Sequence, residues 1–474
     1  MERKSAWTLY SKTELKKVDA YAKAYMDFLN KGKTERECTD YIINEIEREG
    51  YQEFGSLMKK KKKLVKGDRV YFCGMNKTLL MFRVGTAPIE EGMNILGAHI
   101  DSPRLDVKSN PLYEDGGFAY FDTHYYGGIK KYQWVTIPLA IHGVVVKKDG
   151  TTVIVNVGEE EDDPVFFISD LLIHLAAEQM EKKANKVVEG EALDVIIANS
   201  PLPQQSKPKD KEKDKEKKTE EKEAVKKNVL AILKEYYQIE EEDFHSAELE
   251  IVPAGKAKEA GFDRSMILSY GHDDRVCAFS SYRAMLEVND AERTTCCILT
   301  DKEEIGSVGA TGMKSRFFEN SVAELMNAMG CYSELALRRV LANSFMLSSD
   351  VTSGFDPLYK SSFDKKNVAM LGYGFDFCKF TGSRGKSGSN DANAEYLGKI
   401  RKIMDDAGAM YQMSELGKVD LGGGGTIAYI MALYGMNVID CGVPVMNMHA
   451  PYEAISKADI YENKKGYIAF LRNA

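Results

Sequence analysis

Apolar and polar positions follow two different patterns along this chain. Over Thr13–Glu49, apolar residues recur at the three- and four-residue spacing that predicts helices. Unbroken apolar runs of strand length then appear, and those at 93–99 and 296–300 are followed by imidazole or carboxylate side chains. Between these two runs, residues 111–191 show short apolar runs separated by Gly, Asp and Lys turns. Such a pattern is typical of an antiparallel β-rich region.

The pattern of longer strands and helices returns after the β-rich region. Met266–Tyr270 predicts a strand that leads into a helix beginning near Asp273, and Phe345–Ser349 predicts another strand. A helix is predicted over Ile427–Tyr434, and a long apolar run begins at Val438. Strands that alternate with helices in this way are typical of α/β proteins.

The β-rich region contains three features that the sequence describes in more detail. A strand is predicted over Trp134–Leu139, and an amphipathic helix is predicted over Ile168–Glu181. Residues 205–227 form a Lys- and Glu-rich segment in which positive and negative charges nearly balance. A balanced charge run is typical of a solvated loop rather than of a nucleic-acid-binding arm.

The composition excludes two classes of partner. With 474 residues, 44% of them apolar and 29% charged, the chain suits a globular protein with a sizeable core. A net charge of −8 and a pI of about 5.6 argue against a general nucleic-acid binder, whose surface is basic. No run of 18 apolar residues occurs, so we expect no membrane-spanning helix.

The cysteines indicate the cellular compartment. The chain has eight, and none of them forms a Cys-x-x-Cys pair. Most lie in apolar runs, which favours buried free thiols over disulfides or a thiolate zinc site. The N-terminal residues lack the apolar core of a signal peptide. We therefore expect a cytoplasmic protein.

The segment Asp301–Gly306 carries the first candidate chemistry. The strand predicted over 296–300 leads into the adjacent glutamates Glu303 and Glu304, and a Gly-rich loop follows. On extended backbone, neighbouring side chains point to opposite sides. One carboxylate would then face a cleft while the other faces a different partner. For this segment alone, a solvated charged turn is an equal alternative.

A second candidate pair follows the apolar run at 93–99. That run ends in His99, and Asp101 comes two residues later. A metal-bound imidazole usually donates its other N–H group to a carboxylate, and Asp101 has a spacing that suits this support. Taken alone, a structural histidine beside an aspartate is the more frequent explanation of such a pair.

Other acidic and imidazole groups also stand at the ends of predicted strands. Asp273 and Asp274 begin a predicted helix, where they either cap the helix or bridge two cations. Asp350 ends one apolar run, and His449 ends the long run that begins at Val438. In parallel α/β sheets, functional groups gather at the carboxyl ends of the strands. The joint set of imidazoles and carboxylates predicts a site for two zinc-like divalent cations.

Taken together, these motifs resemble those of the aspartyl aminopeptidases, a family within the di-zinc exopeptidases. The resemblance spans nearly the whole chain and is carried by Gly97–Leu105, Asp273–Arg275, Asp301–Ser307, Ser349–Asp350 with Gly354 and Pro357, and Met448–His449. It implies a metal-dependent aminopeptidase that removes N-terminal residues, including acidic Asp or Glu, from peptides with a free N-terminus. Zinc is the implied metal, with cobalt or manganese as alternatives.

The resemblance also implies a set of metal ligands. Asp273 would bridge the two cations, because the bridging aspartate comes first in the family's Asp-Asp-Arg tripeptide. His99 and Asp350 would complete one cation site. Glu304 and His449 would complete the other site. None of these assignments follows from the spacing of the residues alone; each is carried over from the matching motif.

Two further roles come from the same resemblance. Glu303 would act as the general base, and Asp101 would orient His99. The segment Gly382–Asn393 departs from the family's version near the substrate pocket, so the preference for acidic residues stays open. In or near this segment, Lys379, Arg384 and Lys386 are candidates to hold a substrate carboxylate, although an ordinary surface residue is the more frequent explanation for each of them.

The architecture that the resemblance implies is an α/β fold with an inserted domain. A mixed, largely parallel sheet sandwiched by helices, of the zinc exopeptidase type, would form the catalytic domain from residues 1–108 and 254–474. A β-rich dimerisation domain would occupy residues 109–253 and contain the Lys/Glu-rich loop at 205–227. Similar proteins form homo-oligomers, and a dodecamer built from dimers is the implied assembly.

Two other functions remain open at this point. One is a different di-metal amidohydrolase, such as a deacylase or a carboxypeptidase, since the same ligand types would serve it. The other is a non-catalytic cage scaffold. The complete set of ligand-type residues argues against a scaffold, because a scaffold has no need of all of them.

Overall fold

The computed structural model describes residues 4–60, 63–201 and 222–474. Within these, the chain divides into two compact units. Unit 1 comprises Met1–Ser102 and Lys256–Ala474, and unit 2 comprises Pro103–Gly255. The predicted Lys/Glu-rich loop lies outside the described residues as far as residue 221.

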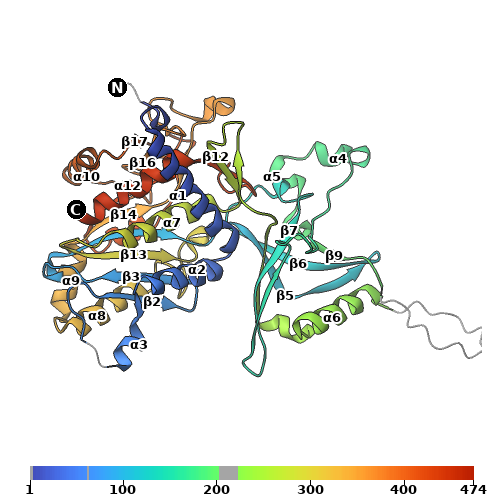
Figure 1. Cartoon of the computed structure of the whole chain (residues 1–474). Helices are drawn as coiled ribbons and strands as arrows, with labels where there is room; N and C mark the ends of the chain where they lie inside the picture. The colour runs from blue at the N-terminus through green and yellow to red at the C-terminus, as the bar shows by residue number, and fades with distance from the viewer. Residues whose placement is uncertain (1–3, 61–62, 202–221) are drawn as a thin grey trace, which may run out of the picture. The chain divides into compact units, whose positions relative to one another are not determined.

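Unit 1 is built on a mixed sheet of nine strands (Figure 1). In spatial order these are β1 (Gln52–Glu53), β2 (Arg69–Gly74), β3 (Thr78–Arg83), β13 (Thr294–Thr300), β4 (Met93–His99), β14 (Phe345–Ser349), β18 (Asn437–Gly442), β16 (Phe375–Cys378) and β17 (Tyr411–Ser414). The four central strands, from β13 to β18, are parallel to one another. Their carboxyl ends therefore lie along the same edge of the sheet.

The central strands are buried on both faces, which explains their unbroken apolar runs. Every residue of β4 and β13 is buried. Along β13, Cys296 and Ile298 belong to one hydrophobic core, while Cys297 and Leu299 belong to another. Alternate side chains of a strand point to opposite faces, so these two cores lie on the two faces of the sheet.

Helices supply the other half of each core, so the sheet is sandwiched between helical layers (Figure 1). One layer consists of α1 (Lys12–Lys31), α2 (Glu35–Arg48), α7 (His272–Glu287), α10 (Ala394–Ala407) and α12 (Lys457–Asn473). The other consists of α3 (Phe54–Lys59), α8 (Phe317–Met329), α9 (Glu334–Ala342) and α11 (Ala428–Ala432). The predicted α/β fold, with a mixed and largely parallel sheet between helices, is confirmed.

A second, smaller sheet of five strands also belongs to unit 1. Its order is β11 (Lys258–Ala260), β12 (Met266–Ser269), β20 (Glu453–Ser456), β19 (Pro444–Met446) and β15 (Thr352–Ser353). The long apolar run that begins at Val438 is therefore divided between two sheets. Its first part forms β18 and its second part forms β19, and Val443 is the residue at which the chain crosses from one sheet to the other.

Unit 2 contains an antiparallel sheet of six strands. Its order is β8 (Thr152–Val157), β7 (Leu139–Val146), β10 (Ala247–Pro253), β5 (Arg104–Asp115), β6 (Phe118–Tyr126) and β9 (Val195–Ala198). The helices of this unit are α4 (Ala177–Met180), α5 (Ala184–Val187) and α6 (Ala224–Tyr237). A dimerisation role for this β-rich unit stays a prediction.

Two of the secondary-structure predictions for unit 2, a strand and a helix, are wrong. The strand expected over Trp134–Leu139 is absent as far as Pro138, and β7 begins only at Leu139. Proline has no N–H group for a strand ladder, and Thr136 has a φ of 62°, which is outside the β region. The helix expected over Ile168–Glu181 is reduced to a 3-10 turn at Ile173–Leu175 and the single-turn α4. Its large apolar side chains from Leu171 to Met180 are exposed, so no core stabilises a longer helix.

The sequence makes predictions about two further features, membrane-spanning helices and the cysteine thiols. Among the described residues, no helix combines the length and the apolar character needed to span a membrane. The eight cysteines are free thiols, and six of them are buried. The sequence-based prediction of unpaired, mostly buried cysteines is thus confirmed.

Candidate metal centre

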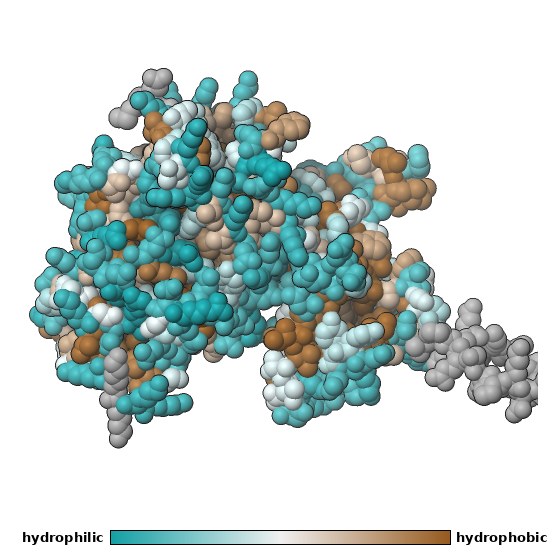
Figure 2. All heavy atoms as spheres, in the orientation of Figure 1, coloured by the Kyte–Doolittle hydropathy of each residue, from teal (hydrophilic) through white to brown (hydrophobic). Residues whose placement is uncertain are grey.

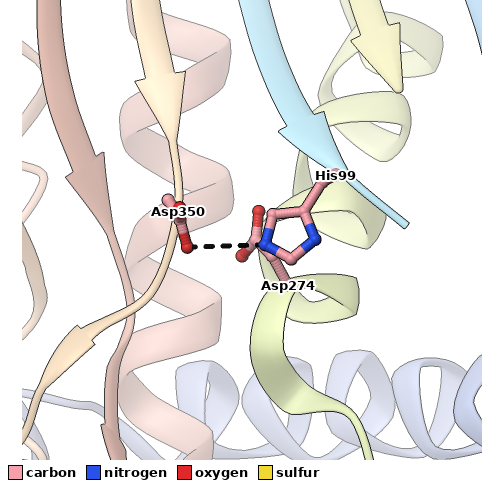
Figure 3. A group of neighbouring side chains, drawn as sticks. All are labelled: His99, Asp274 and Asp350. Carbon is pink, nitrogen blue, oxygen red and sulfur yellow. Dashed lines mark ion pairs between the residues drawn. The ribbon is translucent and has the colours of Figure 1, made fainter. Parts of the chain in front are cut away.

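The candidate ligands of unit 1 arrive from separate elements at one edge of the central sheet. His99 is the last residue of β4, and Asp350 follows the last residue of the adjacent parallel strand β14. Asp273 and Asp274 lie in the first turn of α7, which follows β12. Figure 3 shows His99, Asp274 and Asp350 pointing toward one another from two strand ends and a helix start. The expected convergence of distant imidazole and carboxylate groups is therefore present.

Asp273 lies between the two candidate histidines. Its Oδ1 atom is 3.2 Å from His99 Nε2, and its Oδ2 atom is 3.2 Å from His449 Nε2. The other predicted ligands complete the two sides. On the His99 side, Asp350 Oδ1 is 3.7 Å from His99 Nε2. On the His449 side, Glu304 Oε1 is 3.5 Å from His449 Nε2. The structure thus brings all five predicted metal ligands together.

The glutamate pair does not have the extended geometry expected from the sequence. Strand β13 ends at Thr300, Lys302 adopts a left-handed φ of 65°, and Glu303–Ile305 form a 3-10 turn. Both carboxylates therefore reach the same cluster: Glu303 Oε2 is 3.9 Å from His99 Nε2, while Glu304 faces His449. The expectation that the two side chains point to opposite sides is wrong, because the strand does not continue to residue 303.

Asp101 supports the cluster from behind His99. His99 Nδ1, the ring nitrogen that faces away from Asp273, lies 3.0 Å from the backbone carbonyl oxygen of Asp101 and 3.3 Å from its Oδ1 atom. The same carboxylate accepts hydrogen bonds from the backbone N–H groups of Glu303, at 3.1 Å, and Glu304, at 3.2 Å. Asp101 therefore contacts the imidazole and also anchors the glutamate turn.

Asp274 is a further acidic group at the cluster that the ligand assignment did not use. One of its oxygens lies within 4.8 Å of ligand atoms of both His99 and Asp350. Burial, with the charge of Asp350 in addition, raises the pKa of Asp274 well above its usual range. The carboxylate of Asp274 is met by the thiol of Cys277, whereas Oε1 of Glu304 is shielded from water and accepts no hydrogen bond from any described residue. Buried carboxylate oxygens in this condition are costly unless a cation meets them.

The pKa values of the cluster are shifted because several carboxylates are buried close together. Burial disfavours ionisation of Asp273, but His449 and His99 outweigh this effect and hold its pKa below the usual range. Burial raises the pKa of Glu303 to about 8; His99 opposes this shift and Asp350 adds to it. The pKa of Glu304 is raised well above normal by burial and by Asp273. The two histidines are therefore too few to balance the carboxylates.

The donor set fits divalent cations of the zinc type. Such ions take imidazole nitrogen and carboxylate oxygen ligands, and a paired site needs a carboxylate between its two halves. Asp273 supplies that carboxylate, with a histidine and a second carboxylate on each side of it. The oxygens that lack hydrogen bonds are the acceptors that cations would satisfy. The residues present thus fit the metal implied by the motifs.

Glu453 is a buried acidic residue at this site that the motif search misses. It is the first residue of β20, is 1% exposed, and accepts hydrogen bonds from the backbone N–H groups of Asp273 and His449. Its sequence surroundings show no ligand-like spacing. Only its position four residues after His449, at the start of an apolar strand, would have drawn attention to it.

Known proteins resemble this chain over its whole length. A family profile described as aminopeptidase I zinc metalloprotease (M18) matches residues 28–471. A protein of Clostridium acetobutylicum named as a probable M18 family aminopeptidase 1 is 57% identical over 472 residues, which cover 100% of this chain and 98% of that protein. A protein of the same name from Thermotoga maritima is 44% identical over 472 residues, covering 99% of each chain.

Solved structures agree with these sequence matches. The crystal structure of an M18 family aminopeptidase from Thermotoga maritima superposes with a TM-score of 0.92 at 43% identity and covers 100% of both chains. That of aminopeptidase I from Clostridium acetobutylicum gives a TM-score of 0.91 at 55% identity, again with 100% of both chains. The chain therefore belongs to the aminopeptidase I zinc metalloprotease (M18) family and is a peptide hydrolase of the aminopeptidase class.

Proposed function

We propose that this chain hydrolyses the first peptide bond of peptides with a free α-amine, using two divalent cations and Glu303 as general base. The observation that carries the proposal is the position of Asp273, whose two carboxylate oxygens each lie 3.2 Å from a different histidine. A single carboxylate in this position suits a pair of cations rather than one. Zinc is the metal named in the family description, and cobalt or manganese are the alternatives.

The proposed mechanism assigns the proton transfers to this chain. Bound cations supply Lewis-acid polarisation of the peptide carbonyl and favour ionisation of the attacking water. Glu303 accepts a proton from that water and delivers it to the nitrogen of the peptide bond. The leaving group is then a neutral amine rather than its anion. Asp101 holds His99 through its second ring nitrogen. The same carboxylate holds the turn that carries Glu303.

An acidic preference is the finer part of the proposal. Arg384, Lys386 and Lys418 line a cavity of about 390 Å³ together with Phe380, Leu416 and a single acidic residue, Glu415. Positive charge in such a cavity favours a substrate carboxylate. Lys386 Nζ also lies 2.9 Å from Asp391 Oδ2, so a substrate carboxylate would compete with Asp391 for this lysine. We therefore propose a preference for acidic residues that is weaker than one set by an unopposed lysine.

An aminoacyl-reporter screen tests both parts of the proposal. The purified protein is assayed with free-amine reporters of many side chains, their N-acetylated forms and C-terminal substrates, each with added zinc, cobalt or manganese. We expect turnover of free-amine reporters only, with Asp and Glu among the better ones. Equal turnover of N-acetylated reporters would point instead to a deacylase, and turnover of C-terminal substrates to a carboxypeptidase. Absence of turnover with every reporter and metal would favour a scaffold.

We also propose a homo-oligomer, with a dodecamer built from dimers as its form. Unit 2 exposes a group of apolar side chains around α4, which appears in brown in Figure 2. This apolar patch consists of Leu171, Leu172, Ile173, Leu175 and Met180, each between 47% and 69% exposed. Exposed apolar groups of this kind usually mark contact with another protein. A yeast relative of this fold is described as a dodecamer, which supports the same form here.

Mass photometry of the full chain tests the assembly. The apolar patch is charged in a Leu172→Asp, Ile173→Asp double variant, and Leu433→Asp in unit 1 serves as a control at another exposed leucine. We expect the double variant to lower the particle mass and the control to leave it unchanged. A monomeric wild-type protein would refute the oligomer.

We place the protein in the cytoplasm, where reducing conditions suit its free thiols.

A further inference from the structure

A buried carboxylate outside the ligand set joins two segments that each carry a candidate ligand. Glu453 lies at the start of β20, beside Ser269 at the end of β12. Its Oε2 atom accepts a hydrogen bond from the N–H group of Asp273 at 3.0 Å. Its Oε1 atom accepts one from the N–H group of His449 at 2.7 Å. The two halves of one carboxylate thus hold residues that are far apart in the sequence.

We propose that Glu453 is a positioning residue for the cation pair, which fixes the backbones of Asp273 and His449 relative to each other. The inference rests on the proposed function, in which Asp273 bridges the cations and His449 binds one of them. Glu453 itself is not proposed as a ligand, since both of its oxygens are used by backbone donors. Its effect on the cations acts through the residues that it holds.

A carboxylate is the side chain that this geometry requires. Two N–H donors converge on Glu453, and an ionised carboxylate presents acceptors to both. The isosteric amide of glutamine has one acceptor and one donor, so it leaves one N–H group facing an NH₂ group. Because Glu453 is 1% exposed, water cannot replace the lost acceptor without a local rearrangement.

Neither anchored segment is held by regular secondary structure at the anchored residue. His449 has a φ of 65°, in the left-handed region that a residue with a β-carbon occupies only when its surroundings impose it. Asp273 has non-helical backbone angles although it lies in the first turn of α7. Each N–H group therefore needs a partner outside its own segment, and Glu453 supplies it for both.

Asp101 provides a parallel on the other side of the cluster. It accepts hydrogen bonds from the N–H groups of Glu303 and Glu304 and lies beside the ring of His99. Asp101 and Glu453 therefore have the same role. Each connects two segments that carry candidate ligands, and neither is itself one of those ligands. The arrangement predicts that Glu453 acts on His449 and on the shared ligand Asp273, while Asp101 acts on His99 and on the turn that carries Glu303 and Glu304.

Zinc titration of the full-length, chelator-stripped protein tests this role. Wild type, Glu453→Gln and Asp459→Asn are compared by competition with a chromophoric chelator, and their thermal unfolding is recorded. Asp459 is a matched control: it is fully buried and accepts backbone N–H groups of Gly372 and Gly374 at 2.7 and 2.8 Å, in a loop that carries no candidate ligand. Its replacement removes the same kind of anchor at a different place.

We expect Glu453→Gln to weaken zinc binding by about 10–100-fold, with the larger loss at the half that contains His449, because the shared ligand Asp273 belongs to both halves. Asp459→Asn should lower the unfolding temperature and leave both affinities unchanged. Turnover of Glu453→Gln should return when zinc is raised in proportion to the lost affinity. If Glu453→Gln does not fold, the titration of Glu453→Asp, which keeps the charge but is one methylene shorter, decides in its place.

Two results separate this inference from the function on which it rests. If wild type binds fewer than two zinc ions, the two-cation function fails, whatever the variant does. If wild type binds two and Glu453→Gln binds both with wild-type affinity, the function stands and the positioning role is refuted. An equal loss of affinity in Asp459→Asn would also refute it, because the effect would then be one of general stability.

Discussion

Two buried histidines, one in each unit, show what distinguishes a structural charge pair from the candidate metal centre. In unit 2, His142 is 1% exposed and its Nε2 atom lies 3.2 Å from Glu159 Oε1. On the strand next to it, the buried Glu250 lies 3.1 Å from the Nε atom of Arg104. Each buried carboxylate there meets a group that is positively charged or can become so.

The cluster around His99 in unit 1 has no such balance. His99 is 2% exposed, and together with His449 it meets the carboxylates of Asp101, Asp273, Asp274, Glu303, Glu304 and Asp350. Burying this excess of negative charge is costly unless cations compensate it. The comparison teaches that the number of carboxylates per histidine, rather than burial or the presence of a His–carboxylate contact, marks the functional site.

Removal of metal should have the largest effect on this contrast. Exhaustive chelation should abolish turnover of an aminoacyl reporter, because the carboxylates around His99 then lose the charge that balances them and the water is no longer activated. Zinc, cobalt or manganese added back should restore turnover. The measurement is a metal titration of the stripped protein, with the remaining metal quantified. Full turnover of a protein free of metal would remove the basis of the two-cation mechanism.

Replacement of the proposed base should have the next largest effect. Glu303→Gln should lower kcat by about 10²–10⁴-fold, the usual contribution of a general base. The variant should still bind both cations, because Glu303 is not among the proposed ligands, and its Oε2 atom lies 3.9 Å from His99 Nε2, farther than the oxygens of Asp273 and Asp350. Single-turnover kinetics and zinc content are measured on the same sample. Near-normal kcat in a variant with its full metal content would exclude Glu303 as the base.

Loss of one oxygen acceptor at Asp101 should have a smaller effect. Asp101→Asn keeps one acceptor, but its NH₂ group cannot accept one of the two hydrogen bonds that now come from Glu303 and Glu304. We expect a 10–100-fold loss of metal affinity or activity, the range typical of groups that support a metal ligand. Zinc affinity and kcat are measured together, with Asp459→Asn as the control. Unchanged values for both quantities would show that His99 and the glutamate turn hold their positions without Asp101.

The part of the site that lies on the central sheet could be predicted from the sequence. The runs at 93–99 and 296–300 are largely apolar because β4 and β13 are buried on both faces, and this pattern is visible without a structure. Because parallel strands end at one edge, His99 and the segment after Thr300 could be expected to meet there. The same argument groups His449 and Asp273 with them, but the strands that precede these two residues belong to the smaller sheet, so the common edge of the central strands does not itself explain their position.

Other features could not be predicted because their causes lie outside the local sequence. Glu453 recognises backbone N–H groups, which leave no side-chain pattern to search for. The orientation of Glu303 and Glu304 depends on the left-handed conformation of Lys302. Lysine rarely adopts this conformation, so the sequence does not predict a turn there. The helix expected over Ile168–Glu181 has the correct period, but its apolar side is exposed in unit 2, and period alone does not stabilise a helix.

The smallest effect on turnover is expected at the other histidine of the comparison. His142→Gln removes the group that pairs with Glu159, so it should lower the free energy of unfolding by about 1–3 kcal/mol, the usual cost when a buried polar group loses its partner. It should leave kcat and zinc content unchanged, because none of the candidate ligands lies in unit 2.

Urea unfolding and zinc analysis are measured on His142→Gln, Glu159→Gln and the double variant. If the pair is structural, the double variant should be less destabilised than the sum of the single changes. A loss of zinc or of kcat in His142→Gln would mean that a histidine with a single carboxylate partner also serves the metal centre, and the carboxylate-to-histidine ratio would no longer distinguish the two regions.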